Sequence, residues 1–164
     1  MDRKPKRSIL IIRRAKQKDV PAIVELIAND ELGRLRENFK TPLPEQYLNA
    51  FDKVNADQNQ ELMVRLNETG DVIGTLQLSF IQYLTYQGGI RAQIEAVRMH
   101  ENYRNKGIGQ ELIKWAIDRA EERGAHVVQL TTDKKRDTAV KFYEKLGFIA
   151  SHKGMKLHLH QIIK

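Results

Sequence analysis

The segment that most constrains the fold is the run Tyr-Arg-Asn-Lys-Gly-Ile-Gly at residues 103–109. It follows an apolar, strand-like run at 94–99 and precedes an amphipathic run at 108–123, and a further apolar run, which looks like a buried strand, occupies 126–132. A strand, a crossover helix and a second strand in one sheet place the two strands parallel, with a right-handed connection. The sequence therefore predicts one parallel strand pair, with this loop at the beginning of the helix between the strands.

The same loop has the composition of an anion-binding site. Glycine has no Cβ atom to keep a ligand away from the backbone. The beginning of a helix has unpaired amide N–H groups and partial positive charge, and Arg104 and Lys106 add full charges. We therefore expect a pyrophosphate to bind here.

Spacing excludes two common phosphate-binding loops. A P-loop has Gly-Lys followed by Ser or Thr, whereas here Lys106 precedes Gly107 and Gln110 stands at the hydroxyl position. A dinucleotide fingerprint has a small residue three positions after its second glycine. That position is Leu112 in this chain, so neither a nucleoside triphosphate nor a dinucleotide fits the pattern.

The remaining apolar patterns predict a mixed α/β domain. Turn signals and apolar periodicity place the other elements between Gly- and Pro-containing segments. The expected order is a strand at 9–12, helices that begin after Asp19 and at 44, strands at 61–66, 72–83 and 91–99, a helix at 108–123, a strand at 126–132, a helix capped by Asp137, and a closing hairpin of strands at 148–151 and 155–159. We expect a central mixed, mostly antiparallel sheet of about seven strands flanked by about four helices.

Composition favours a single domain without cysteine chemistry. The 164 residues suffice for one core, and the absence of cysteine excludes disulfides, a thiol nucleophile and Cys-based metal sites. Apolar runs stay well short of the roughly 20 residues that span a bilayer, so we expect a cytoplasmic protein without a membrane partner. His158 and His160 share one predicted strand face but have no third ligand nearby, so no metal is expected.

The positive charge is confined to the beginning of the chain. Residues 1–18 hold eight basic residues and one acidic residue, which accounts for the whole net charge of +7. We expect a flexible basic arm at 1–7 and one folded domain at 8–164. A basic arm can contact phosphates, but such arms are more often solvated tails, so nucleic acid is not expected as a partner.

Three segments together resemble the Gcn5-related N-acetyltransferase (GNAT) family. They are Ile-Glu-Ala-Val-Arg-Met at 94–99, Arg-Asn-Lys-Gly-Ile-Gly-Gln-Glu-Leu at 104–112, which fits Arg/Gln-x-x-Gly-x-Gly/Ala, and Phe-Tyr-Glu-Lys-Leu-Gly-Phe at 142–148. In element order the resemblance covers about residues 8–160. It implies the GNAT fold, acetyl-CoA as the donor and a primary amine as the acceptor.

The resemblance also implies a donor site around the loop and the strand before it. In this family the pyrophosphate lies on the loop amides, and the pantetheine arm pairs with a strand that is bulged and splays from its parallel neighbour. A broken ladder leaves backbone groups that an amide-bearing arm can satisfy. The family often has Asn near the end of the following strand, where Asp133 keeps the acceptor oxygens but lacks the amide donor. The expected acetyl-CoA-binding residues are Val97, Arg98, Met99, Arg104, Asn105, Lys106, Gly107, Ile108, Gly109, Gln110 and Asp133.

Glu95 and Tyr143 are the expected catalytic residues. An alkylamine is mostly protonated at pH 7, so a group must accept its proton. Glu95 lies two positions before Val97, near the expected thioester. We expect it to accept the proton directly or through a water. The resemblance makes Tyr143 the general acid for the departing thiolate. In the competing interpretations Glu95 faces solvent or pairs with an arginine, and Tyr143 only packs in the core.

The identity of the acceptor is left open by the sequence. We expect a small-molecule amine that attacks the thioester directly in a ternary complex, since no cysteine can carry the acetyl group. A protein or peptide N-acetyltransferase, a non-enzymatic acyl-CoA-binding module and a nucleic-acid-binding protein are the alternatives. A homodimer, in which a second subunit completes the acceptor pocket, also remains open.

Overall fold

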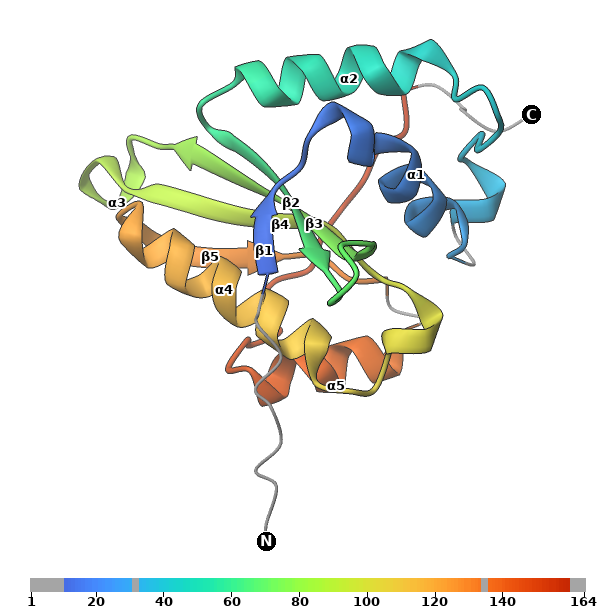
Figure 1. Cartoon of the computed structure of the whole chain (residues 1–164). Coiled ribbons are helices and arrows are strands. Elements are labelled where there is room, and N and C mark those ends of the chain that lie inside the picture. The colour runs from blue at the N-terminus through green and yellow to red at the C-terminus, as the bar shows by residue number, and fades with distance from the viewer. Residues whose placement is uncertain (1–10, 31–32, 134–135, 160–164) are drawn as a thin grey trace, which may run out of the picture.

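The computed structural model describes residues 11–30, 33–133 and 136–159, which form a five-stranded sheet with helices against both faces (Figure 1). The predicted basic arm at 1–7 and His160 lie outside the described residues. None of the described helices is long and apolar enough to cross a membrane. The elements are β1 (Ile11–Arg14), a 3-10 helix (Gln17–Asp19), α1 (Val20–Ala28), a 3-10 helix (Gly33–Leu35), α2 (Glu45–Ala56), β2 (Gln60–Leu66), β3 (Val72–Gln82), α3 (Thr85–Gly88), β4 (Ile90–Met99), a 3-10 helix (Glu101–Tyr103), α4 (Ile108–Glu122), β5 (Ala125–Leu130) and α5 (Asp137–Lys145).

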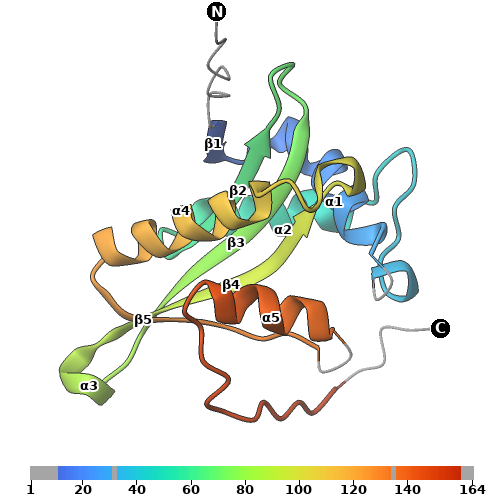
Figure 2. The same ribbon diagram turned by 90° about the horizontal axis from the view of Figure 1, so that it is seen from below.

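The strand order in the sheet follows the chain, from β1 to β5. β1 to β4 pair antiparallel and β5 pairs parallel to β4, which confirms the predicted parallel pair. The parallel ladder runs only from Ile90 with Ala125 to Ile94 with Leu130. Beyond it the two strands diverge, with α4 and α5 on one face of the sheet and α1 and α2 on the other (Figure 2).

Two apolar clusters attach the helices to the sheet. In α4, Leu112, Ala116 and Ala120 recur every four residues and are fully buried, as expected for the stripe of a helix that faces a sheet. They pack in one cluster with Leu76 and Leu78 of β3. The second cluster joins α1 and α2 to β2 on the opposite face. Both faces of the sheet therefore carry an apolar cluster.

Asp19 is the N-cap residue of α1, as predicted, but its carboxylate makes no capping bond to that helix. It accepts instead from the Lys16 amide at 2.7 Å and from both terminal nitrogens of Arg13 at 2.6 and 3.0 Å. The buried carboxylate thus ties the end of β1 to the beginning of α1. At α5 the predicted cap is displaced by one residue, since Arg136 is the N-cap and Asp137 begins the helix.

The predicted closing hairpin is wrong, because the described residues after α5 contain no strand. Alternating apolar residues form a strand only when a neighbouring strand and a core face receive them. Met155, Leu157 and Leu159 meet neither and remain 96%, 85% and 80% exposed. The described sheet therefore has five strands rather than about seven.

Two smaller expectations also need correction. The β3–β4 connection, where no helix was expected, contains the single helical turn α3, so the described residues hold five α-helices rather than about four. β5 was expected to be buried, but His126 and Val127 are exposed because no strand covers the outer edge of β5 among the described residues.

Candidate functional site

The loop between β4 and α4 presents amide groups that the fold does not use. Asn105 and Gly107 have left-handed backbone angles, with φ of 58° and 78°, and Gly107 is the N-cap of α4 without a side-chain cap. In the described part of the chain, no acceptor receives the amide N–H groups of residues 105–110. Successive amides in such a conformation form a concave anion site, and the helix dipole adds to it.

The two glycines of the loop have different roles in the fold. A side chain at Gly107 would meet no atom within 4 Å, so only the positive φ favours glycine there. A Cβ at Gly109 would lie 3.7 Å from Met99 Cγ and 3.9 Å from Phe142 Cζ, which are ordinary contacts. Gly109 therefore marks the place where β4, α4 and α5 meet, and a methyl group fits there.

β4 contains a bulge where it leaves β5. Glu95 pairs with Gln77 and Arg98 pairs with Thr75, so β4 holds one more residue than β3 over this stretch. Ala96, within the bulge, has a φ of 53°. The bulged and splayed strand expected from the family resemblance is therefore present.

The carbonyl groups beyond the bulge accept hydrogen bonds from arginine side chains. Val97 C=O accepts from Arg98 Nη1 at 2.7 Å, and Met99 C=O accepts from Arg104 Nε at 3.1 Å. Carbonyls two residues apart on a strand point to the same edge. This edge is the one that β5 leaves open, so it can offer acceptors to an amide-bearing ligand.

Glu95 lies at the end of a row of polar side chains that crosses β4 and β5. Its Oε1 accepts from Gln93 Nε2 at 2.9 Å, and Gln93 Oε1 accepts from Gln129 Nε2 at 2.6 Å. The Glu95 side chain is exposed, and among the described residues it makes no ion pair with an arginine. A held but accessible carboxylate can take up a proton through water.

Tyr143 of α5 packs its ring while remaining partly accessible. It contacts the rings of Phe142 and Phe148, with centroids 5.1 and 5.8 Å away, and it packs against the same core cluster as Val97. Burial raises the pKa of the Tyr143 hydroxyl, while the positive charges of Arg98 and Arg136 oppose that change. The phenol is therefore protonated at neutral pH, as an acid must be.

Asp133 lies in the segment after β5, where its carbonyl accepts the Arg136 amide at 2.9 Å. Its side chain is exposed. The predicted contact of Asp133 with the donor stays a prediction. In the described residues, His, Cys, Asp and Glu form no group of three or more that could hold a metal ion.

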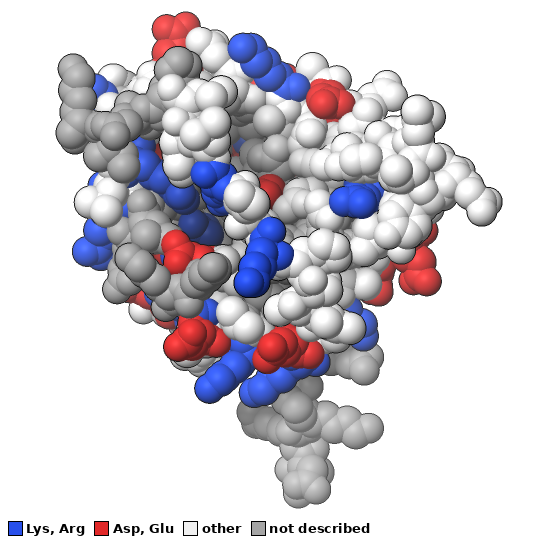
Figure 3. All heavy atoms as spheres, turned by 180° about the vertical axis from the view of Figure 1, so that it is seen from behind, with Lys and Arg blue, Asp and Glu red and all other residues white. Residues whose placement is uncertain are grey.

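A cluster that the sequence did not predict joins α1, β4 and α5. The carboxylate of Asp30, just after α1, pairs with Arg98 Nη2 at 3.2 Å and through both oxygens with Arg136 Nη2. Burial lowers the pKa of Arg98. The negative charge of Asp30 raises it by less, and the positive charges of Arg136 and Arg36 lower it further. In the view from behind, basic groups gather on the side that carries α1, beside a depression in the surface (Figure 3).

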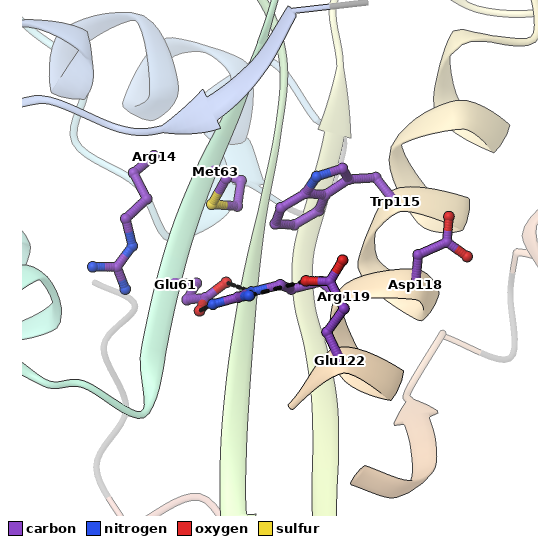
Figure 4. Close-up of a pocket in the computed structure, with 7 residues that line it drawn as sticks. All are labelled: Arg14, Glu61, Met63, Trp115, Asp118, Arg119 and Glu122. Carbon is purple, nitrogen blue, oxygen red and sulfur yellow. Dashed lines mark hydrogen bonds and ion pairs between the residues drawn. The ribbon is translucent and has the colours of Figure 1, made fainter. Parts of the chain in front are cut away.

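A separate hollow of about 390 Å³ lies against the carboxyl-terminal half of α4 (Figure 4). Its lining residues include Glu61, Trp115 and Arg119. Glu61 is buried and its carboxylate pairs with Arg119 at 2.8 Å and Arg123 at 3.2 Å. The charges in this hollow therefore satisfy one another, as expected for a structural ion-pair network.

The Glu61 network gives a prediction for stability. Burial raises the pKa of Glu61. The hydrogen bonds and charge of Arg119 lower it, as do the charges of Arg14 and Arg123, and the net pKa lies below the ordinary value. The stabilisation is thus complete above the ordinary glutamate pKa of about 4.3 and is lost as the pH falls below it. We expect Glu61→Gln to reduce the free energy of unfolding by about 2 kcal/mol at pH 7.

Urea denaturation at pH 7 and in acid measures this effect. The difference between wild type and Glu61→Gln should shrink in acid, because protonated Glu61 resembles glutamine. Glu122→Gln is the matched control, since Glu122 also pairs with Arg119 but is 67% exposed. It should cost less than about 0.5 kcal/mol. Equal losses in both variants would contradict the assignment.

Comparisons with known proteins agree with this geometry. The model of the acetyltransferase (GNAT) family matches residues 22–148. An L-methionine sulfoximine/L-methionine sulfone acetyltransferase of Pseudomonas paraeruginosa is 27% identical over 139 residues, which are 84% of this chain and 78% of that protein. A glucosamine 6-phosphate N-acetyltransferase of Trypanosoma brucei brucei is 33% identical over 91 residues, covering 56% and 60%. A crystal structure of a protein named a transcriptional regulator from Bacillus halodurans C-125 is 50% identical, with a TM-score of 0.88, covering 92% and 99%.

Proposed function

The chain belongs to the GNAT family and is an N-acetyltransferase, and we propose that it transfers an acetyl group from acetyl-CoA to the primary amine of a small molecule. The observation that carries the proposal is the loop after β4, whose amides at 105–110 have no partner in the described chain. It lies directly after the strand edge that β5 leaves open. The relatives named above act on methionine sulfoximine and on glucosamine 6-phosphate, which supports a small amine as the acceptor.

The residues around the loop fit the parts of CoA. The amides of residues 105–110, with Arg104 and Lys106, hold the pyrophosphate by hydrogen bonds and charge. The backbone of Val97 and Met99 pairs with the pantetheine amides along the open edge of β4. Asp133 accepts one further hydrogen bond from the same arm.

Glu95 and Tyr143 divide the proton transfers between them. When bound, acetyl-CoA supplies an activated thioester. Glu95 removes a proton from the acceptor ammonium, directly or through a water, because only the neutral amine is a nucleophile. The amine nitrogen then bonds to the acetyl carbon while the bond from that carbon to sulfur breaks. Tyr143 donates its phenolic proton to the departing thiolate, and the second proton of the acetylated nitrogen passes through water to the Tyr143 phenolate. The product is the neutral amide with free CoA thiol, and no covalent enzyme intermediate forms.

The proposal is tested by following acetyl-CoA consumption with a panel of small amines and with a peptide that carries a free amino terminus. We expect turnover with at least one small amine and linear double-reciprocal plots that intersect, as for a ternary complex. Turnover restricted to the peptide would transfer the assignment to a protein acceptor. CoA binding without any turnover would contradict the proposed reaction.

Replacing Tyr143 with phenylalanine should lower kcat about 10-fold. A thiolate is a tolerable leaving group, so losing its proton donor slows the reaction without stopping it. The KM for acetyl-CoA should change little, because the ring contacts with Phe142 and Phe148 remain. Tyr83→Phe is the matched control and should retain wild-type kcat. An unchanged kcat in Tyr143→Phe would remove the tyrosine from the mechanism.

A further inference from the structure

We propose that Arg98 and Arg136 bind an acidic group of the acceptor, so that the preferred acceptor is an amine that also carries a carboxylate, phosphate or phosphonate. The inference rests on the proposed function, since it defines the substrate class of the same site. It comes from the Asp30 cluster, which is Asp30 with Arg98 and Arg136, and not from the donor loop between β4 and α4.

The Asp30 cluster carries more positive than negative charge among the described residues. One carboxylate, Asp30, is shared by two guanidinium groups, of Arg98 and Arg136. Arg36 lies close enough for its charge to act on Arg98. Arg36 itself pairs with Glu37 at 3.3 Å, and both side chains of that pair are partly exposed. Counted over the described residues, the inner part of the cluster, Asp30 with its two arginines, has one more positive charge than negative.

That excess charge is mostly buried. The side chains of Asp30 and Arg98 are 13% and 14% exposed. Arg98 Nε is buried, and no acceptor reaches it in the described chain. Excess charge away from water is costly unless it is paired. A second anion beside Arg98 and Arg136 would reduce this cost, and a planar guanidinium suits the two oxygens of a carboxylate or phosphate.

The arginines of the Asp30 cluster lie beside the proposed reacting groups. The charges of Arg98 and Arg136 both act on the hydroxyl of Tyr143, the proposed acid. Arg98 is also three residues beyond Glu95, the proposed base, on the same strand. Arg98 Nη1 also donates to Val97 C=O at 2.7 Å, on the strand proposed to pair with the donor. An acceptor whose amine lies between Glu95 and Tyr143 is therefore beside the arginines.

Arg136 is the residue to replace. Its side chain is 33% exposed, whereas Arg98 is buried and also bonds to the Val97 carbonyl. The substrates are two matched pairs, O-phosphoethanolamine with ethanolamine and leucine with leucinamide, which differ by one acidic group. We expect the wild-type kcat/KM to be at least about 10-fold higher for one acidic member than for its neutral partner.

Arg136→Gln should reduce this preference about 10-fold through the acceptor KM, and Arg136→Lys should restore part of it. The KM for acetyl-CoA should not change, and the neutral amines should lose much less turnover than the acidic ones. Arg36→Gln, which replaces a side chain that is 46% exposed, is a second variant and should reduce the preference less. Arg34→Gln is the matched control from the same loop, since Arg34 is exposed and outside the cluster, and it should keep the wild-type preference.

Equal use of both members of each pair by the wild type would overturn the inference, and so would an equal loss for both members in Arg136→Gln. Calorimetry separates this outcome from failure of the proposed reaction. If no amine is acetylated, binding of O-phosphoethanolamine to the CoA-loaded protein still tests the site. Binding that is lost in Arg136→Gln supports the anion site while refuting the reaction, whereas the absence of binding refutes the anion site.

Discussion

Replacing Gly107 with valine is expected to weaken CoA binding by at least about 100-fold, because it combines backbone strain with loss of converging amides. Gly107 has a φ of 78°, a conformation in which a β-branched residue is a rare outlier. The loop must therefore change its backbone, and the amides of residues 105–110 will no longer point to one place. Titration calorimetry with CoA measures the loss directly.

Two other glycines provide the controls for this prediction. Gly70, in the β2–β3 turn, has a φ of 90° and open space around it, so Gly70→Val carries similar strain away from the site and should bind CoA normally. Gly109→Ala adds a methyl group that fits, and alanine is worth up to about 1 kcal/mol more than glycine within a helix. It should bind CoA and melt at a higher temperature. Native affinity in Gly107→Val would contradict the assignment of the loop.

Replacing Glu95 with glutamine should lower kcat/KM about 100-fold near pH 7, which is the usual contribution of a general base. Glutamine can keep the hydrogen bond from Gln93 but cannot accept a proton from the amine. The affinity for CoA should stay the same, since the Glu95 side chain is not among the groups assigned to CoA. Steady-state kinetics and calorimetry together measure both quantities.

The pH dependence provides a stricter test of Glu95. In the variant, only amine that is already neutral in solution can react, so its rate should rise with pH towards the pKa of the free amine. The difference from wild type should become smaller as the pH rises. Glu25→Gln, an exchange on the exposed side of α1, is the control. A wild-type pH profile in Glu95→Gln would show that another group accepts the proton.

The elements around the donor loop could be predicted because their signals are local. The stripe of Leu112, Ala116 and Ala120 has helical period, and glycine at 107 and 124 matches the two ends of α4, where both residues have positive φ. When one strand precedes such a helix and another follows it in the same sheet, the two strands are parallel and the connection is right-handed. The parallel pair and the position of the loop follow from these facts alone.

The arginine cluster could not be predicted in the same way. Asp30 is 68 residues from Arg98 and 106 residues from Arg136 along the chain. Nothing in the local pattern of any of the three indicates the others, since only the folded sheet brings α1 and α5 to the same end of β4. The closing hairpin failed for the opposite reason, because a clear local pattern at 155–159 has no partner strand among the described residues.

The bulge in β4 places Glu95 and Arg98 on the same face of the strand, where both can face one acceptor. Side chains on a regular strand alternate between faces, so Glu95 and Arg98, three positions apart, would point in opposite directions. Ile94 and Val97 would likewise be opposed, yet both pack in the cluster under α4. The extra residue at Ala96 reverses the parity of every position after it. If the same residues formed a regular strand without the bulge, Arg98 would point into the apolar core and Val97 out of it, which would exchange the two linings of the site.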